Sequence, residues 1–245
     1  MLTLARLVTL GGLIALGGPA FAQVETPTLR HVAAVGPAMS TAPDALALAT
    51  RGAVLVHVPP DAEQGPHAVK HHLLEHDPNA PVLGNPDGDV TVVEFTDYND
   101  PVSRAIQPEV AQLLEADPGV RLLIREWPTL GGPSEIAARA ALAARAQGAY
   151  SVLHGAFLGL EPDVPADDRP ALTLAQVLGL DVEQLYRDMA SSEVEEHLAA
   201  SARLAEALHL SARPSFVIGD MILHGAPNRG ELVAAVEAAR NAKAE

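Results

Sequence analysis

The stretch 90–104 places an apolar run directly before a helix start, and it constrains the fold more than any other part of the sequence. Residues 90–95 are β-branched or apolar except for Glu94 and contain no glycine or proline, which is typical of a central strand buried on both faces. Asp100 is a good N-cap and Pro101 suits the first helical position, so we expect a helix to begin here. Such a junction is a natural place for chemistry, because the free N–H groups of the helix point toward it.

Apolar runs and helical periodicity predict the elements that follow. A second strand after the helix would complete a strand–helix–strand unit, and the chain would close with a hairpin and a helix. The predicted elements are a strand at 120–127, helices over 133–210 with breaks at 155–160, 161–170 and 179–180, strands at 214–218 and 221–224 joined by a turn at Gly219-Asp220, and a helix over 228–242.

The first 22 residues have the pattern of a secretory signal peptide. Arg6 precedes a short apolar run, and Ala20-Phe21-Ala22 is a small-residue cleavage pattern. The run is too short and too rich in glycine for a membrane-spanning helix. We therefore expect cleavage before Gln23, export to the periplasm of a bacterial cell envelope, and no membrane span in the mature chain. A retained N-terminal anchor is the alternative.

An N-terminal extension ending in a helix is predicted over 23–80. Prolines interrupt short apolar runs through 23–65, which favours an extended or partly ordered segment with a short helix near 44–49. A helix is expected over 66–77, and the Gly-, Pro-, Asn- and Asp-rich segment 79–89 is interpreted as a loop that leads to the central strand.

Charge and composition exclude several classes of function. The formal net charge of −15 argues against nucleic acid and anionic membrane surfaces as partners. The sequence contains no cysteine, which excludes disulfides, thiolate nucleophiles and cysteine metal sites. Phosphate-binding glycine loops, zinc-protease motifs and nucleophile elbows are also absent from the sequence, and we expect no cofactor.

Three short motifs, taken in order, resemble the DsbA-like branch of the thioredoxin superfamily, the periplasmic thiol–disulfide oxidoreductases. They are Val-Glu-Phe-Thr-Asp-Tyr at 93–98, Glu-Trp-Pro-Thr-Leu-Gly at 126–131 and Arg-Pro-Ser-Phe-Val at 213–217. The resemblance covers 66–245 and implies an α/β thioredoxin fold with an inserted helical domain. On this basis 81–132 and 210–245 form the thioredoxin-fold domain and 133–209 form the inserted helical domain, after the signal peptide 1–22 and the extension 23–80.

Where the family carries Cys-Pro-Xaa-Cys, this chain carries Asp100-Pro101-Val102-Ser103. Thiol–disulfide exchange requires a thiolate that attacks a sulfur, so redox catalysis by this chain alone is not expected. A serine nucleophile at Ser103 would need a general base in hydrogen-bond reach, for example His209 or His224. Asp100 is explained as an N-cap and Ser103 as a first-turn polar residue. A deliberately altered oxidoreductase fits less well, because Arg213 also departs from the family pattern.

The resemblance gives meaning to three further residues. Pro214 stands at the position of the family's cis-proline, which holds the backbone of a substrate, and Arg213 replaces a threonine or valine. We expect Arg213 either to pair with Asp100 across the groove or to point to solvent. Glu94 matches an acid that handles protons for the buried cysteine. Its place among valines predicts burial and a raised pKa, and without a cysteine we interpret it as a relic that a hydroxyl group or water satisfies.

Clustered histidines are a weak candidate for a metal site. His67/His71 and His72/His76 are i,i+4 pairs on the predicted helix, a spacing that lets two imidazoles share a metal. The two pairs point about 140° apart at 3.6 residues per turn, so one helix cannot join them in a four-ligand site. Each pair would need a carboxylate or a second chain. Histidines on a solvated surface are the alternative.

These observations predict an exported DsbA-like protein that is redox-inactive. We expect it to bind a polypeptide or an envelope protein in the groove near Pro214, as a chaperone or adaptor and not as an enzyme. A family-type thiol–disulfide oxidoreductase and a metal-binding envelope protein are the alternatives. By analogy with relatives, the N-terminal extension is a candidate for forming a homo-oligomer.

Overall fold

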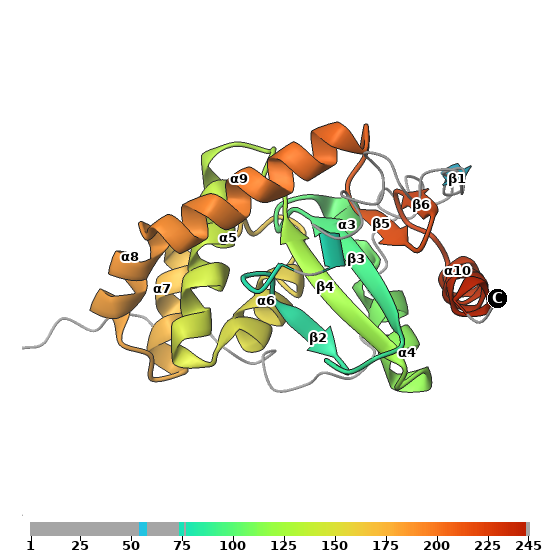
Figure 1. Ribbon diagram of the computed structural model, residues 1–245. Helices are drawn as coiled ribbons and strands as arrows, with labels where there is room; N and C mark the ends of the chain where they lie inside the picture. The colour runs from blue at the N-terminus through green and yellow to red at the C-terminus, as the bar shows by residue number, and fades with distance from the viewer. Residues whose placement is uncertain (1–53, 58–73, 76, 244–245) are drawn as a thin grey trace, which may run out of the picture. The chain divides into compact units, whose positions relative to one another are not determined.

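The computed structural model of the protein describes residues 54–57, 74–75 and 77–243 (Figure 1). The expected signal peptide and the short helix near 44–49 lie outside the described residues. So do the metal-site candidates His67, His71, His72 and His76. Of the helix expected over 66–77, only Leu74 and Glu75 are described as helical.

Within the described residues, the strands form one mixed sheet of order β1-β6-β5-β3-β4-β2. The strands are β1 (Val54–His57), β2 (Val82–Gly84), β3 (Val90–Thr96), β4 (Val120–Glu126), β5 (Ser215–Ile218) and β6 (Met221–His224). The interior strand β3 is parallel to β4 and antiparallel to β5, and all its residues are buried. This confirms the predicted central strand, and the hairpin of β5 and β6 is confirmed as well.

Two edge strands differ from the sequence-based expectations. β2 lies inside the segment that was interpreted as a loop, and it pairs antiparallel with β4. It is only three residues long, follows Pro81 and ends at Gly84, which has a positive φ, so it is too short to show an alternating pattern. β1 adds to the opposite edge through antiparallel pairing with β6, within the segment expected to be extended.

The helices follow the predicted order but not all the predicted breaks. They are α3 (Pro101–Ala105), α4 (Gln107–Ala116), α5 (Gly132–Ala143), the 3₁₀ helix η2 (Ala144–Gln147), α6 (Tyr150–Leu158), α7 (Asp168–Val177), α8 (Val182–Met189), α9 (Ser192–Ala207) and α10 (Arg229–Ala242). The helix that begins at Pro101 is divided at Ile106, and α6 continues to Leu158 through part of the expected break at 155–160. Instead, the chain turns earlier at Gly148, which has a φ of 69°. In the described part of the chain, no helix is both long and apolar enough to cross a membrane.

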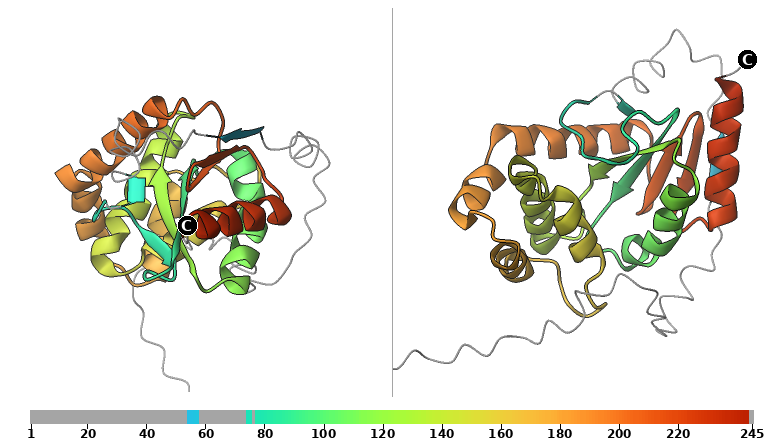
Figure 2. Two further views of the ribbon diagram at one scale, coloured as in Figure 1. Left: turned by 45° about the vertical axis from the view of Figure 1, so that its right-hand side comes forward. Right: turned by 90° about the horizontal axis from the view of Figure 1, so that it is seen from below.

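Alternating side chains of β3 divide the core between the two faces of the sheet. Val90 and Val92 belong to a cluster that includes residues of α4 and α10, whereas Val93 and Phe95 pack in a second cluster with residues of α9. Helices α5 to α8 lie together beside the sheet, on the opposite side from α10 (Figures 1 and 2). This arrangement brings loops of the helical insertion close to the start of α3.

Candidate functional site

The candidate site lies where β3 ends and α3 begins. The Asp100 carboxylate accepts a hydrogen bond from the Ser103 backbone N–H at 2.6 Å, which confirms the predicted N-cap. Asp100 is only 8% exposed. Burial raises the pKa of its carboxyl group, although the Ser103 N–H and the nearby Arg213 charge act in the opposite direction. The site therefore holds a partly desolvated carboxylate where the family places a cysteine.

Asp97 fixes the loop that follows β4 against the start of α3. One of its carboxylate oxygens accepts from the Asn99 N–H at 3.0 Å. The other accepts from the N–H groups of Thr129 and Leu130 at 2.8 and 3.1 Å. Asp97 itself is 1% exposed, so its capacity as an acceptor is largely used within the protein.

Arg104 and Asn99 bind the loop between α6 and α7 to the same site. The Arg104 guanidinium donates to the carbonyl oxygens of Tyr98 at 2.7 Å, Glu161 at 3.1 Å and Val164 at 3.0 Å. The Asn99 side chain both accepts from and donates to the backbone of Ala166, at 2.7 and 2.9 Å. The hydrogen bonds of Arg104 and Asn99 thus fix the geometry of the site without any cysteine.

Pro214 and Arg213 lie on the segment that leads into β5. The Arg213–Pro214 peptide bond is cis, which is the conformation of the family's proline at this position. The Arg213 guanidinium carbon lies 5.6 Å from the centroid of the Trp127 ring, and Trp127 packs edge-on against Phe95 at 6.3 Å. The expected ion pair with Asp100 does not form as a direct contact within 4 Å, although Arg213 still acts electrostatically on that carboxylate. Of the two alternatives for Arg213, the direct ion pair with Asp100 is therefore not observed, and the guanidinium of this half-buried residue stacks on an aromatic ring.

The backbone of Arg213 is free at the end of the sheet. The β5–β3 ladder begins at Ser215, which pairs with Phe95. The Pro214 carbonyl accepts from the Gly225 N–H at 2.8 Å, but the N–H and C=O of Arg213 make no hydrogen bond with any described residue. A half-buried residue with both backbone groups unpaired is suited to pair with another extended segment.

Ser103 is fully buried in the first turn of α3, and its hydroxyl oxygen makes no hydrogen bond. Neither His209 nor His224 contacts it; the His224 Nδ1 lies 2.9 Å from the Ser215 hydroxyl instead. A serine nucleophile needs a base in hydrogen-bond reach, and none of the described residues provides one. The geometry therefore gives no support to hydrolytic chemistry at Ser103.

Glu94 is fully buried beneath the same helices, as the sequence predicted. Its Oε1 accepts from the Gln107 side chain at 3.0 Å, whereas its Oε2 has no hydrogen-bond partner. Burial raises the pKa of this carboxyl group to about 7. The predicted pKa shift is thus confirmed; the amide of Gln107 donates the hydrogen bond, and the Thr96 hydroxyl group also acts to lower the pKa.

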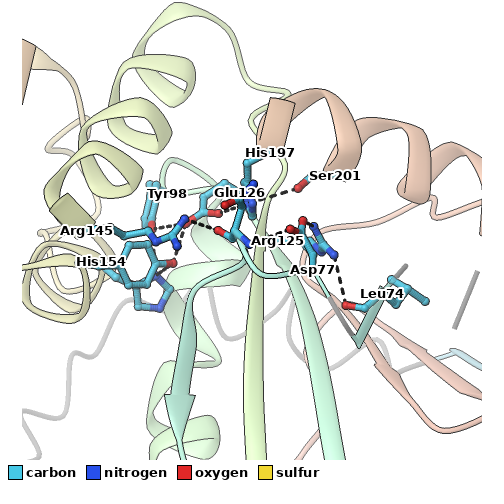
Figure 3. Close-up of polar contacts among 11 residues, drawn as sticks. Leu74, Asp77, Tyr98, Arg125, Glu126, Arg145, His154, His197 and Ser201 are labelled. Atoms are coloured by element: carbon cyan, nitrogen blue, oxygen red, sulfur yellow. Dashed lines mark hydrogen bonds and ion pairs between the residues drawn. The ribbon is translucent and has the colours of Figure 1, made fainter. Parts of the chain in front are cut away.

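A buried polar network around Glu126 joins the sheet to the helical insertion, and sequence reasoning missed it (Figure 3). Glu126 accepts from the Tyr150 hydroxyl at 2.6 Å and lies 2.7 Å from the His197 Nε2. His154 Nδ1 lies 2.9 Å from the Tyr98 hydroxyl and 3.3 Å from that of Tyr150. A charged residue at the end of an apolar strand was the available signal, but its partners come from α6 and α9.

The pKa values in this network follow from burial and from hydrogen bonds. Burial raises the pKa of Glu126, but the hydrogen bond and charge of His197 outweigh it, so the net pKa is lowered. Burial lowers the pKa of His154 to about 4. No three His, Asp or Glu side chains among the described residues are arranged as ligands for a metal ion. We interpret the network as a link between the two parts of the fold.

Comparisons with known proteins agree with this architecture. The Thioredoxin family model matches residues 76–238. A thioredoxin-like oxidoreductase from Silicibacter pomeroyi DSS-3 is 50% identical, with a TM-score of 0.67, and the match covers 69% of this chain and 97% of that one. A periplasmic thioredoxin-like protein from Salmonella enterica serovar Typhimurium is 26% identical, with a TM-score of 0.63, over 71% of this chain and 97% of that one.

The similar curated proteins are much longer. Na(+)/H(+) antiporter NhaA 3 from Salinispora tropica is 31% identical over 161 residues, which cover 64% of this chain and 24% of the antiporter. The chain therefore spans about a quarter of the length of the curated relatives it matches.

The family match, the strand order and the structural neighbours agree with one another, and the sequence contains no cysteine. The chain belongs to the thioredoxin family, has a DsbA-like fold and contains no Cys-Xaa-Xaa-Cys pair.

Proposed function

We propose that this protein binds extended polypeptide segments and does not catalyse thiol–disulfide exchange. The observation that carries the proposal is the backbone of Arg213, which lies before β5 and whose N–H and C=O groups have no hydrogen-bond partner among the described residues. An extended segment could pair with these groups and so continue the sheet beyond Ser215. The protein would then act as a chaperone or an adaptor.

The absence of exchange follows from the chemistry of the chain. Disulfide exchange needs a thiolate nucleophile, and neither Asp100 nor Ser103 can supply one. Asp97, Asn99 and Arg104 nevertheless hold the surrounding loops by hydrogen bonds. A surface that holds polypeptide does not require sulfur, so binding can persist without the reaction.

The proposed location is the periplasm. The sequence pattern of 1–22 and the periplasmic thioredoxin-like protein from Salmonella enterica both support export. The proposed partners are polypeptides or a protein of the cell envelope, and the extension 23–80 is a candidate for homo-oligomer formation. The similarity to a region of an antiporter does not extend its transport activity to this chain, which covers 24% of that protein.

The proposal can be tested with the purified protein and two labelled clients. One is an unfolded polypeptide followed by fluorescence anisotropy, and the other is a disulfide-linked peptide followed by its reduction in glutathione buffer. We expect saturable binding of the first and no acceleration with the second. Failure to bind the unfolded polypeptide would contradict the proposal.

A double variant, Asp100→Cys with Ser103→Cys, serves as a positive control for the scaffold. It restores Cys-Pro-Val-Cys at the start of α3, where the helix N-terminus lowers thiol pKa values. We expect this variant to gain exchange activity while it still binds the unfolded polypeptide. If the wild-type protein were as active as the double variant, the proposed lack of exchange would be wrong.

A further inference from the structure

Arg213 forms no direct ion pair with an acidic residue in the part of the chain that the structure describes, although the chain is strongly acidic. The formal net charge is −15; Arg125, Arg139 and Arg240 pair with carboxylates, and Arg104, Arg121 and Arg145 donate to backbone carbonyl oxygens. Arg213 forms no ion pair within 4 Å among the described residues, and its buried Nε makes no hydrogen bond. Among the described residues, therefore, no carboxylate neutralises this guanidinium through a direct contact.

Asp100, on which the Arg213 charge acts, and its neighbour Asp97 are both occupied by other contacts. Asp100 accepts from the Ser103 N–H at 2.6 Å, and Asp97 accepts from Asn99, Thr129 and Leu130. Stacking on Trp127 holds the guanidinium beside the groove and leaves its polar edge without a carboxylate. The position is therefore ready to receive an anionic group.

We infer that Arg213 selects bound segments that carry an aspartate or glutamate side chain beside the residue that pairs with the Arg213 backbone. This inference rests on the proposed function, because it requires a polypeptide in the groove. A planar guanidinium suits a carboxylate, which it can bind through two parallel hydrogen bonds. The rest of the segment is preferentially apolar, because Leu130 and Val164 are 45% and 36% exposed on loops bound to the same site.

Matched peptides test this selectivity. Three labelled, extended peptides consist of apolar residues, have blocked ends and carry Glu, Gln or Lys at one central position. A fourth peptide carries Gln and has a free C-terminal carboxylate. Binding to the full protein is measured by anisotropy. We expect the Glu peptide to bind about fivefold more tightly than the Gln peptide, as is reasonable for a partly exposed ion pair, and the Lys peptide to bind weakest.

Two variants assign the effect to Arg213. Arg213→Thr, which restores a residue found in relatives, should bind Glu and Gln peptides equally, whereas Arg213→Lys should keep part of the preference. Arg229→Gln removes an arginine at the start of α10, whose side chain contacts Gln112, and should leave the preference unchanged. Preference retained in Arg213→Thr would overturn the inference.

The outcomes separate the inference from the proposed function. Equal binding of the blocked Glu and Gln peptides would overturn the inference and leave polypeptide binding standing. Tight binding confined to the free carboxylate would also overturn it, in favour of C-terminal capture. If none of the peptides bound, the proposed function itself would fail.

Discussion

Glu94 and Glu126 are fully buried carboxyl groups on neighbouring parallel strands, yet their surroundings differ sharply. Glu126 is held by Tyr150 and His197, and its pKa is lowered despite burial. Burial raises the pKa of Glu94 to about 7, although the hydrogen bond from Gln107 and the Thr96 hydroxyl group act in the opposite direction. The comparison teaches that burial alone does not set the charge of a carboxyl group; the donors placed around it decide the outcome.

The two carboxyl groups also differ in role: Glu126 stabilises the fold, whereas we interpret Glu94 as a relic of the family's chemistry. Glu126 joins β4 to α6 and α9, so it contributes to the connection between the sheet and the insertion. Gln107 donates to both Glu94 and the Ser103 carbonyl, and the family resemblance implies that Glu94 matches an acid that serves a buried cysteine. With no cysteine in the chain, Glu94 keeps the cost of burial without that function.

The largest expected effect is that of removing the Glu126 carboxylate. Glu126→Ala would leave His197 and Tyr150 buried without their acceptor, and we expect a loss of about 3–5 kcal/mol in the free energy of unfolding. Urea denaturation at pH 7 measures it. Glu135→Ala, at a side chain that is 54% exposed, is the matched control and should change little. A loss below about 1 kcal/mol would mean that the network does not stabilise the fold.

Replacing Glu94 is expected to increase the free energy of unfolding at neutral pH, whereas replacing Glu126 decreases it. The pKa of this group rises from 4.5 to about 7 on folding, so the folded protein holds a proton that the unfolded chain releases in this range. The stabilising contribution is complete below pH 4.5 and is lost as the pH rises through 7, about 3 kcal/mol in total. Relative to wild type, Glu94→Gln should therefore gain stability between pH 4.5 and 8.

Denaturation curves of wild type and variant across this pH range measure the gain. His154 acts in the other direction, because its pKa is lowered to about 4 on folding and its contribution is lost as the pH falls. Wild type and variant share the contribution of His154, so it cancels when their free energies of unfolding are subtracted. Glu115→Gln, at an exposed position of α4, is the control. A difference that does not change with pH would contradict the raised pKa of Glu94.

A smaller loss is expected when one donor of Glu126 is removed. Tyr150→Phe deletes the 2.6 Å hydrogen bond to the carboxylate, and hydrogen bonds to charged groups are worth about 1.5–3 kcal/mol. The free energy of unfolding should fall by this amount, and the pKa of Glu126 should rise. Tyr186→Phe removes a hydroxyl group from a 44% exposed residue and serves as the control. An equal loss of stability in the two variants would show that the Tyr150 hydrogen bond does not stabilise the fold.

The smallest effect concerns the hydrogen bond from Gln107 to Glu94. Gln107→Met removes the 3.0 Å hydrogen bond, so the pKa of Glu94 should rise further and the free energy of unfolding should fall by about 1 kcal/mol. Carbon-13 NMR titration of the carboxyl group follows the pKa directly. An unchanged pKa would show that Gln107 does not hold Glu94 in solution.

Local patterns were sufficient to predict much of the fold. β3, the helix start at Asp100, the β5–β6 hairpin and the capped start of α10 each depend on residues that are adjacent in sequence. β2 was missed because three residues do not show a period, and the break at Ile106 was missed because Pro108 is compatible with the first turn of a new helix.

The site was predictable only where one element determines it. The burial of Glu94 follows from its strand, and the family resemblance placed Pro214 opposite Asp100. The contacts of Glu126 and the stacking of Arg213 on Trp127 join segments that are distant in sequence. No pattern within one segment contains such pairings, because they depend on how the helical insertion and the β5 segment pack against the sheet.

The most direct test of binding without exchange is the turbidity of insulin after addition of dithiothreitol, in the presence of excess purified protein. Catalysed reduction of insulin shortens the lag before its chains precipitate, whereas a protein that only binds the released chains lengthens it. We predict a longer lag and a lower final turbidity. A shortened lag would show exchange activity, and an unchanged curve would show that the groove does not hold these chains; either result would contradict the account.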